Sequence, residues 1–217
     1  METFYKILVF FQSGGIFMYP ILLVLAIGLA IAIDRYIYLS YVSTRNRGIW
    51  QRVLPLLENG RREAARDVIL HSNAALGRVL AYGLNRSDRR GNRDEVQMAM
   101  EEGLMEVVPR LEKRTHYLAT LASVATLLGL LGTIIGLTEA FSTVSAADPA
   151  DKANQLSASI SIAMNTTAFG LMVAIPLLLT HAVMQTKTSE LVNMLEMATV
   201  RLSSLIAGTE ESGEIPA

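Results

Sequence analysis

The strongest constraint on this chain is a run of 34 residues, 153–186, that contains no Asp, Glu, Lys or Arg. As an α-helix this run would measure roughly 50 Å, which exceeds the hydrocarbon core of about 30 Å. Hydroxyl, amide and small side chains run through it: Ser157, Ser159, Ser161, Ala163, Asn165, Thr166, Thr167, Ala168, Gly170 and Ala174. A plain anchor would carry bulky apolar residues on all sides, whereas these residues indicate close helix contacts or a path that contains water. The run predicts a membrane helix with a polar role.

Two further apolar runs, residues 16–33 and 117–138, also lack Asp, Glu, Lys and Arg. Hydrophobic residues make up 51% of the chain and charged residues only 18%, which is typical of membrane proteins. No stretch alternates apolar and polar residues as a half-buried strand would. We therefore predict an all-α integral membrane protein with three transmembrane helices, long cytoplasmic helical extensions and a small helical cytoplasmic loop domain.

The basic residues are distributed unevenly between the loops. Of the 19 Lys and Arg residues, 15 lie between Arg35 and Arg114. The positive-inside rule places this stretch and the C-terminus in the cytoplasm, with the N-terminus in the periplasm. Ten acidic residues between Glu58 and Glu112 interleave with the basic ones. This mixture indicates a solvated cytoplasmic face rather than a nucleic-acid patch, so we expect no nucleic-acid partner. The first apolar run is too long for a secretory signal and predicts a retained anchor.

Helical spacing and turn signals divide the chain into seven segments. We expect an amphipathic arm on the periplasmic side over 1–13, the first transmembrane helix over 14–40, a cytoplasmic helical loop region over 41–91, a long helix that includes the second span over 92–138, a periplasmic loop over 139–155, the third span with its cytoplasmic extension over 156–207 and a flexible tail over 208–217. Turn signals at 58–60, 71–73 and 85–88 predict two or three short helices in the loop region. Asn92 is expected to cap the long helix, and Pro109 to kink it without ending it.

The sequence contains no constellation typical of an enzyme or a metal site. There is no Cys, the three His residues form no cluster, and no phosphate-binding loop or nucleophile motif occurs. We therefore expect no catalytic residue, no metal and no cofactor, and a protein that is not an enzyme. No ionisable side chain lies in the middle of a predicted span, so this chain alone offers no proton relay.

Two motifs connect the chain with a known family. Residues 129–136, GLLGTIIG, and residues 166–176, TTAFGLMVAIP, closely resemble the two signatures of the MotA/TolQ/ExbB family, and the ExbB/TolQ branch fits best. The three-span layout and the large cytoplasmic loop extend the resemblance over nearly the whole chain. The resemblance implies a motor subunit of the bacterial inner membrane that forms a homo-pentamer in the lipid bilayer. Its pore would hold helices of an ExbD- or TolR-like single-span partner that carries a membrane Asp. Proton flow past that Asp would act through a TonB- or TolA-like protein to energise outer-membrane transport or a related envelope process.

The motifs also identify candidate site residues. Gly129, Gly132 and Gly136 leave one side of a helix without bulk, which favours close helix packing. Thr133 and Thr167 match the pore threonines of the family. The residues predicted to line an ion path are Thr133, Thr167, Thr126, Ala163, Gly170 and Ala174. The alternative is that the threonines only form hydrogen bonds to carbonyl groups of their own helix.

Two positions depart from the family pattern. Ile162 stands where ExbB-type proteins commonly have Glu, and Thr126 stands where the family tends to have Pro. Asn165, three residues after Ile162, is a possible polar substitute for the missing Glu, but its amide does not titrate. Two hypotheses follow. The chain is either a motor subunit, with H⁺ favoured over Na⁺, whose proton is carried by the partner, or a non-conducting scaffold or accessory subunit of such an energy-transducing complex.

Overall fold

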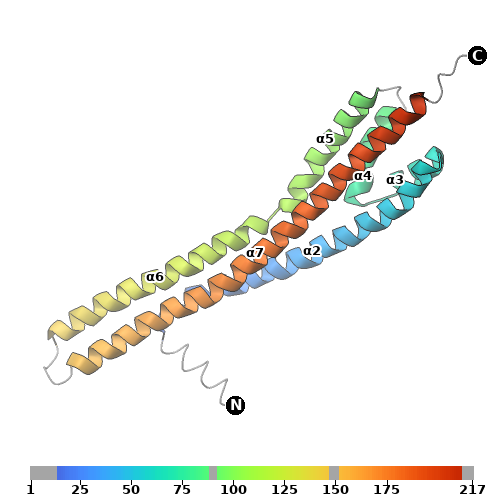
Figure 1. Ribbon diagram of the computed structural model, residues 1–217. Helices are drawn as coiled ribbons and strands as arrows, with labels where there is room; N and C mark the ends of the chain where they lie inside the picture. The colour runs from blue at the N-terminus through green and yellow to red at the C-terminus, as the bar shows by residue number, and fades with distance from the viewer. Residues whose placement is uncertain (1–13, 88–91, 147–151, 212–217) are drawn as a thin grey trace, which may run out of the picture. The chain divides into compact units, whose positions relative to one another are not determined.

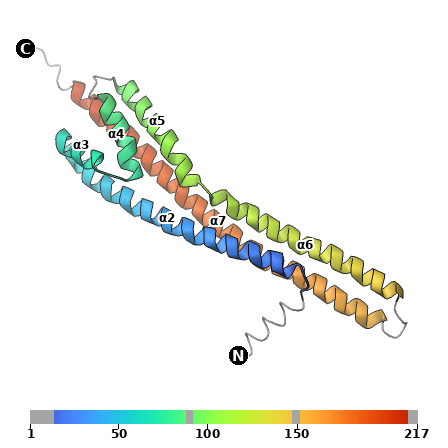
Figure 2. The ribbon, with the colours of Figure 1, turned by 180° about the vertical axis from the view of Figure 1, so that it is seen from behind.

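The computed structural model describes residues 14–87, 92–146 and 152–211 as helices joined by short turns, with no strand among them (Figure 1; Figure 2). The helices are α2 (Met18–Glu58), α3 (Arg62–Leu70), α4 (Ala75–Ser87), α5 (Arg93–Glu112), α6 (Thr115–Ala146) and α7 (Lys152–Glu211). The predicted periplasmic arm 1–13 lies outside the described residues, as does part of the predicted loop 139–155. The all-α fold class is confirmed.

Three helical stretches in the described part of the chain are long and apolar enough to cross a membrane. They are Met18–Glu58, Arg93–Ser142 and Lys152–Leu205, and the second comprises α5 and most of α6. The second and third stretches contain the charge-free runs 117–138 and 153–186, and the first contains the run 16–33 from Met18 onward. The chain is therefore a multi-pass membrane protein with three candidate spans, as predicted.

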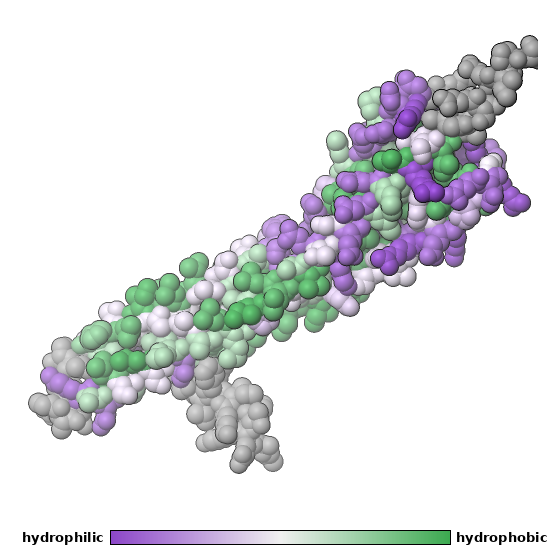
Figure 3. Space-filling model, in the orientation of Figure 1, coloured by the Kyte–Doolittle hydropathy of each residue, from purple (hydrophilic) through white to green (hydrophobic). Residues whose placement is uncertain are grey.

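The chain divides into two compact units. We call Met1–Asp34 with Arg114–Val183 the span unit, and Arg35–Lys113 with Met184–Ala217 the polar unit. The span unit contains α6 and the apolar parts of α2 and α7. Hydrophobic side chains cover much of its visible surface in Figure 3, and hydrophilic side chains dominate the visible surface of the polar unit. Exposed apolar side chains in the span unit include Leu127 at 62% and Leu179 at 64% exposure, as expected of a surface in contact with lipid.

The structure differs from the prediction of one continuous helix over 92–138. Helix α5 ends at Glu112 and α6 begins at Thr115. Lys113 has an extended ψ of 133°, and Arg114 has a left-handed φ of 67°, so neither continues the helix. Pro109 lies inside the last turn of α5, where the helix is about to end. The predicted N-cap is present, because Asn92 Oδ1 accepts a hydrogen bond from the backbone N–H of Glu95 at 2.9 Å.

Other helices are longer than predicted. Helix α2 does not end near residue 40 but continues to Glu58, where the predicted turn at 58–60 stops it. Gly60 adopts a φ of 70° in this turn, a conformation that glycine adopts without steric cost. Helix α6 continues to Ala146, and α7 begins at Lys152 and ends at Glu211. The predicted turn at 71–73 separates α3 from α4.

A buried arginine joins two helices of the polar unit. Arg35 is only 4% exposed, and its guanidinium Nη2 donates a hydrogen bond to the carbonyl oxygen of Leu111. Leu111 lies in the last turn of α5, where carbonyl groups have no partner within their own helix. The Arg35 guanidinium also lies over the ring of Tyr38, at 5.1 Å from its centroid. Arg35 thus caps the end of α5 from α2.

Candidate functional site

Helices α6 and α7 approach each other closely in the span unit because glycines face backbone atoms. A Cβ built on Gly170 of α7 would lie 2.7 Å from the carbonyl oxygen of Ala125 and 3.1 Å from the Cα of Gly129, both on α6. Both neighbours are backbone atoms, which cannot rotate away as the end of a side chain can. Gly129 and Gly170 therefore form the point of closest packing between the two helices.

The other two glycines of the predicted stripe face the same helix. A Cβ on Gly132 would lie 2.4 Å from Thr166 Cγ2, and a Cβ on Gly136 would lie 3.0 Å from the Cβ of Ala163. The structure thus places the glycines of α6 against α7 of the same chain.

The two threonines that match the family motifs meet at this closest point. Thr167 Oγ1 lies 2.8 Å from the carbonyl oxygen of Gly129 and 3.3 Å from Thr133 Oγ1. Thr133 Oγ1 lies 2.6 Å from the carbonyl oxygen of Leu130 in its own helix. Both threonine side chains are half-buried. Two residues that are 34 positions apart in sequence therefore form one pair of hydroxyl groups between α6 and α7.

The hydrogen-bond inventory of this pair determines what it can bind. Each hydroxyl has one proton and two lone pairs. When Thr167 donates to Gly129 O and Thr133 donates to Leu130 O, both protons are used, and each oxygen keeps lone pairs that can accept. The pair then favours a group that donates a proton, such as a protonated carboxylic acid or a water molecule. Thr133 donates to a carbonyl group of its own helix, as in the alternative, whereas Thr167 reaches across to α6.

The remaining predicted path residues occupy different environments. Thr126 is exposed, and its Oγ1 donates to the carbonyl oxygen of Ala122 in its own helix at 3.1 Å. Ala163 and Ala174 are 1% and 2% exposed, and Gly170 is buried against α6. Ala163 lies against Gly136 and Gly170 lies against Gly129, so these two small residues allow the close approach of α6 and α7 within one chain. The part of all four residues in an ion path stays a prediction.

The hydrogen bonds of Thr166 were not predicted from the sequence. This residue is 2% exposed, and its Oγ1 lies 2.6 Å from the carbonyl oxygen of Gly14 and 3.0 Å from that of Ile162. Successive residues of a helix point about 100° apart, so Thr166 and Thr167 necessarily face different neighbours. The paired threonines in the motif, together with the Gly14-Gly15 sequence before the first span, were the signal that could have revealed this contact.

Ile162, at the position where the family commonly has Glu, leaves the three charge-free runs without a carboxylate. Ile162 is 41% exposed, and its Cγ2 would lie 3.2 Å from a Cβ added to Gly15. Asn165, the predicted polar substitute, is half-buried one turn further along α7. Among the described residues, no group of three His, Cys, Asp or Glu side chains could hold a metal ion. The site therefore offers hydroxyl and carbonyl oxygens, which accept hydrogen bonds, and no acid of its own.

Comparison with known proteins places these residues in a family context. A family model described as the MotA/TolQ/ExbB proton channel family matches residues 71–197, which include both motifs and both threonines. The putative biopolymer transport protein ExbB-like 1 of Synechocystis is 30% identical over 83% of this chain and 71% of its own length. The putative biopolymer transport protein ExbB homolog of Methanothermobacter thermautotrophicus is 29% identical over 91% of this chain and 69% of its own. The Tol-Pal system protein TolQ of Haemophilus influenzae is 36% identical over 38% of this chain and 36% of its own.

Proposed function

The chain belongs to the MotA/TolQ/ExbB proton channel family, and on this premise we propose that it is the ExbB/TolQ-like subunit of an ion-driven motor in the bacterial inner membrane. The motor would use the proton motive force, together with an ExbD- or TolR-like partner, and act through a TonB- or TolA-like protein on outer-membrane transport or a related envelope process. The subunit itself would not be an enzyme and would need no cofactor. The observation that carries the proposal is the hydroxyl pair of Thr133 and Thr167 between α6 and α7.

The chemistry of the pair fits a proton carried by the partner. The charge-free runs of this chain contain no carboxylate, so the titrating group must come from another protein. A membrane Asp on the partner, once protonated, can donate a hydrogen bond to either threonine oxygen. An ionised Asp would instead require the threonines to turn their protons toward it. The pair can therefore distinguish the two protonation states of the partner's acid, and the low dielectric of a membrane pore strengthens that difference.

We propose a homo-pentamer as the assembled state. The glycine stripe is already covered within one chain, so the contact between copies requires another apolar surface. In the polar unit, Met197 and Val200 of α7 are 58% and 57% exposed. With Arg201, Ser204 and Leu205 they line an open groove of about 530 Å³. These side chains lie beyond the charge-free run 153–186, and exposed large apolar side chains outside lipid favour a protein contact. Native mass spectrometry in mild detergents that detected only monomer would contradict this assembly.

Substitutions that remove the hydroxyl groups of the two threonines test the proposed ion path. Thr133→Val and Thr167→Val keep the shape of the side chain but remove its donor and its acceptors. Loss of the hydrogen bond costs on the order of 1 kcal/mol in itself, and the larger effect is expected on transport, because the hydroxyl would act on a carboxylate in a low-dielectric pore. We expect the double variant, co-expressed with its partner, to lose transport activity while its oligomer yield stays close to that of the wild type.

Two matched controls separate the ion path from simple packing. Thr133→Ser and Thr167→Ser keep the hydroxyl groups and should retain most of the activity. Thr180→Val changes a half-buried threonine whose hydroxyl donates to Pro176 O of its own helix at 2.8 Å, and should have a milder effect. If the Val variants transport as well as the wild type, the ion-path role is refuted.

That outcome would favour the second candidate function, a non-conducting scaffold or accessory subunit. The specific observation in its favour is Ile162, an apolar residue at the position where ExbB-type relatives commonly have Glu. A scaffold would retain its partner and its oligomer in all five variants without any dependence of activity on the hydroxyls. A neighbouring gene for a single-span protein with a membrane Asp would instead favour the conducting motor.

A further inference from the structure

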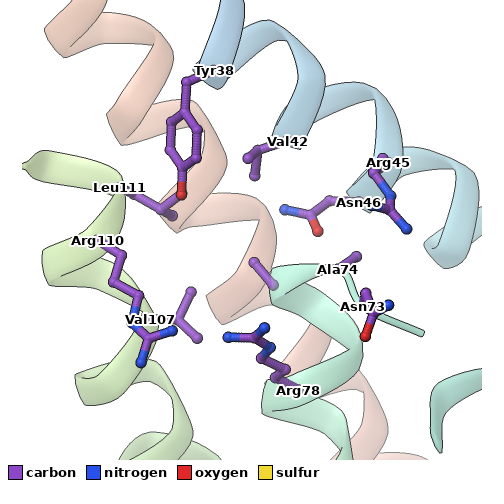
Figure 4. A pocket seen from close by; sticks show the side chains of 11 residues that line it. Tyr38, Val42, Arg45, Asn46, Asn73, Ala74, Arg78, Val107, Arg110 and Leu111 are labelled. Carbon is purple, nitrogen blue, oxygen red and sulfur yellow. The ribbon is translucent and has the colours of Figure 1, made fainter. Parts of the chain in front are cut away.

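The polar unit contains a cavity of about 250 Å³ that no part of the proposed motor explains (Figure 4). Residues of α2, α4 and α5 line it, together with the turn that precedes α4. Its polar lining includes three arginines, one from each of these helices: Arg45, Arg78 and Arg110. No Asp or Glu is among the lining residues. A concave surface with three cations and no lining anion has a positive potential that attracts an anionic ligand.

The three arginines are neutralised to different degrees. Arg110 forms an ion pair with Glu106 of its own helix at 2.9 Å, and both side chains are partly exposed. Arg45 donates to the hydroxyl of Tyr41 at 2.7 Å, which leaves its charge uncompensated. The guanidinium group of Arg78 forms no hydrogen bond or ion pair with any described residue, although its backbone N–H donates to Ala74 O at 3.2 Å. In Figure 4 the guanidinium groups of Arg78 and Arg110 point toward one another beside Val107. Two like charges in this arrangement repel each other unless an anion lies between them.

A buried amide supplies a second, independent observation. Asn46 of α2 is 0% exposed, and its Oδ1 accepts a hydrogen bond from the backbone N–H of Leu76 at 3.1 Å. Its Nδ2 forms no hydrogen bond with any described residue. Figure 4 shows this nitrogen directed into the cavity. Buried donors are nearly always paired in native proteins, so this nitrogen is suited to a ligand that accepts a hydrogen bond.

We propose that this cavity binds a phosphate-bearing anion. A phosphate group has several oxygen atoms that accept hydrogen bonds, and it can bind without donating one. A guanidinium group binds a phosphate through two parallel hydrogen bonds. Arg78 and Arg110 would hold the phosphate from two sides, and Asn46 Nδ2 would donate to one of its oxygens. The volume suits a single phosphate group with a short substituent, because sites for larger organic ligands begin at about 300 Å³.

The phosphate group could belong to an anionic lipid or to a small soluble molecule. Basic pockets near the cytoplasmic end of membrane helices bind the head groups of anionic lipids. In α2, Asn46 follows the last residue of the charge-free run 16–33 by only thirteen positions. A soluble phosphate or phosphate monoester would use the same donors. Both sources are arms of one experiment, which needs no transport activity and is therefore independent of the proposed function.

In the first arm, the purified full-length protein in an uncharged detergent is titrated with inorganic phosphate, and with glycerol 3-phosphate, at constant ionic strength. Trp50, the only tryptophan of the chain, lies four residues after Asn46 on α2 and reports unfolding by its fluorescence. In the second arm, the protein is placed in nanodiscs of phosphatidylglycerol or of phosphatidylcholine, and native mass spectrometry counts the retained lipids. We expect saturable stabilisation in the first arm or selective retention of the anionic lipid in the second. A response in the first arm identifies a soluble phosphate as the ligand, and a response in the second arm identifies an anionic lipid.

Two variants and a matched control make the result specific. Asn46→Asp keeps an oxygen for the Leu76 N–H but replaces the donor with an acceptor, and Arg78→Gln removes the cation that has no partner. Each should weaken binding by about tenfold or more, the effect expected for one charge-assisted hydrogen bond. Arg93→Gln removes the same charge from an exposed position at the start of α5 and should leave binding unchanged. If neither arm responds in the wild type, or if Arg93→Gln weakens binding as much as Arg78→Gln, the proposal is overturned.

Discussion

The replacement of Gly170 by Ala probes the contact on which the whole candidate site depends. The added methyl group would lie 2.7 Å from Ala125 O and 3.1 Å from Gly129 Cα, whereas ordinary contacts begin at 3.4 Å. Because both neighbours belong to the backbone, α6 and α7 have to separate by several tenths of an ångström. Overpacking of this kind costs about 1–3 kcal/mol. Alanine recovers about 0.5–1 kcal/mol of helix propensity. We therefore expect a net destabilisation of roughly 1–2 kcal/mol.

The same separation should loosen the hydroxyl pair. Thr167 Oγ1 and Gly129 O are only 2.8 Å apart, and Thr167 is three residues before Gly170 on α7. A shift of α7 away from α6 lengthens this hydrogen bond and the 3.3 Å contact with Thr133 together. Gly170→Ala should therefore reduce transport activity as well as stability, although the variant changes no polar group.

Gly48→Ala is the matched control. Gly48 lies in the interior of α2, and a Cβ added there meets no atom within 4 Å. This variant should gain the helix propensity without any steric cost and become more stable by about 0.5–1 kcal/mol. Thermal unfolding of both variants in the same detergent, followed by far-ultraviolet circular dichroism, makes the comparison. A Gly170→Ala protein as stable as Gly48→Ala would refute the close approach of α6 and α7.

Three further outcomes are expected. Single cysteines at positions 61 and 148, the latter outside the described residues, test the topology in cells with a permeabilised outer membrane: an impermeant maleimide should label position 148 and not position 61. Tyr82 donates a hydrogen bond to the Glu106 carboxylate at 3.0 Å, which raises the pKa of Tyr82 above 10.0. The stabilisation by this bond is complete below pH 10.0 and is lost as the pH rises through the raised pKa, so the stability difference between wild type and Tyr82→Phe should disappear in strong alkali. Gly60→Ala should lower stability by about 1 kcal/mol, measured by thermal unfolding, because Gly60 has a φ of 70°.

The fold was largely predictable because the membrane imposes simple rules. Charge-free runs of sufficient length have to be helices when lipid surrounds them, and all three predicted spans are present. The break after α5 was not predictable, because Lys113 and Arg114 are ordinary helix residues and carry no glycine or proline signal. The end of α5 is capped by Arg35, which lies 76 residues away from Leu111 in sequence and donates to its carbonyl oxygen. Such a contact depends on tertiary structure and leaves no local pattern.

The site was predictable in its residue types but not in its pairing. Family motifs single out Thr133 and Thr167, and helical spacing places glycines on one side of α6. Neither source tells which carbonyl each hydroxyl reaches, since a threonine in a helix ordinarily bonds to its own preceding turn. Thr133 follows this rule, whereas Thr167 bonds across to α6 because Gly129 exposes its carbonyl group to a neighbouring helix. Because Gly129 has no side chain, its carbonyl oxygen on α6 can accept a hydrogen bond from Thr167 on α7.

Adjacent threonines give α7 two attachments of different kinds. Thr166 Oγ1 has two carbonyl acceptors, Gly14 O at 2.6 Å and Ile162 O at 3.0 Å, and both are fixed in the backbone of the span unit. Thr167 Oγ1 has one carbonyl acceptor and one hydroxyl, Thr133 Oγ1, which can itself rotate. A proton donor that arrives at the pair can therefore rearrange Thr167 and Thr133 by rotation of their hydroxyl groups alone. Meanwhile Thr166, one residue away and buried, holds α7 in place. The motif thus combines one threonine held by backbone acceptors with a second that can change its hydrogen bonds, and the proposed ion path would require both.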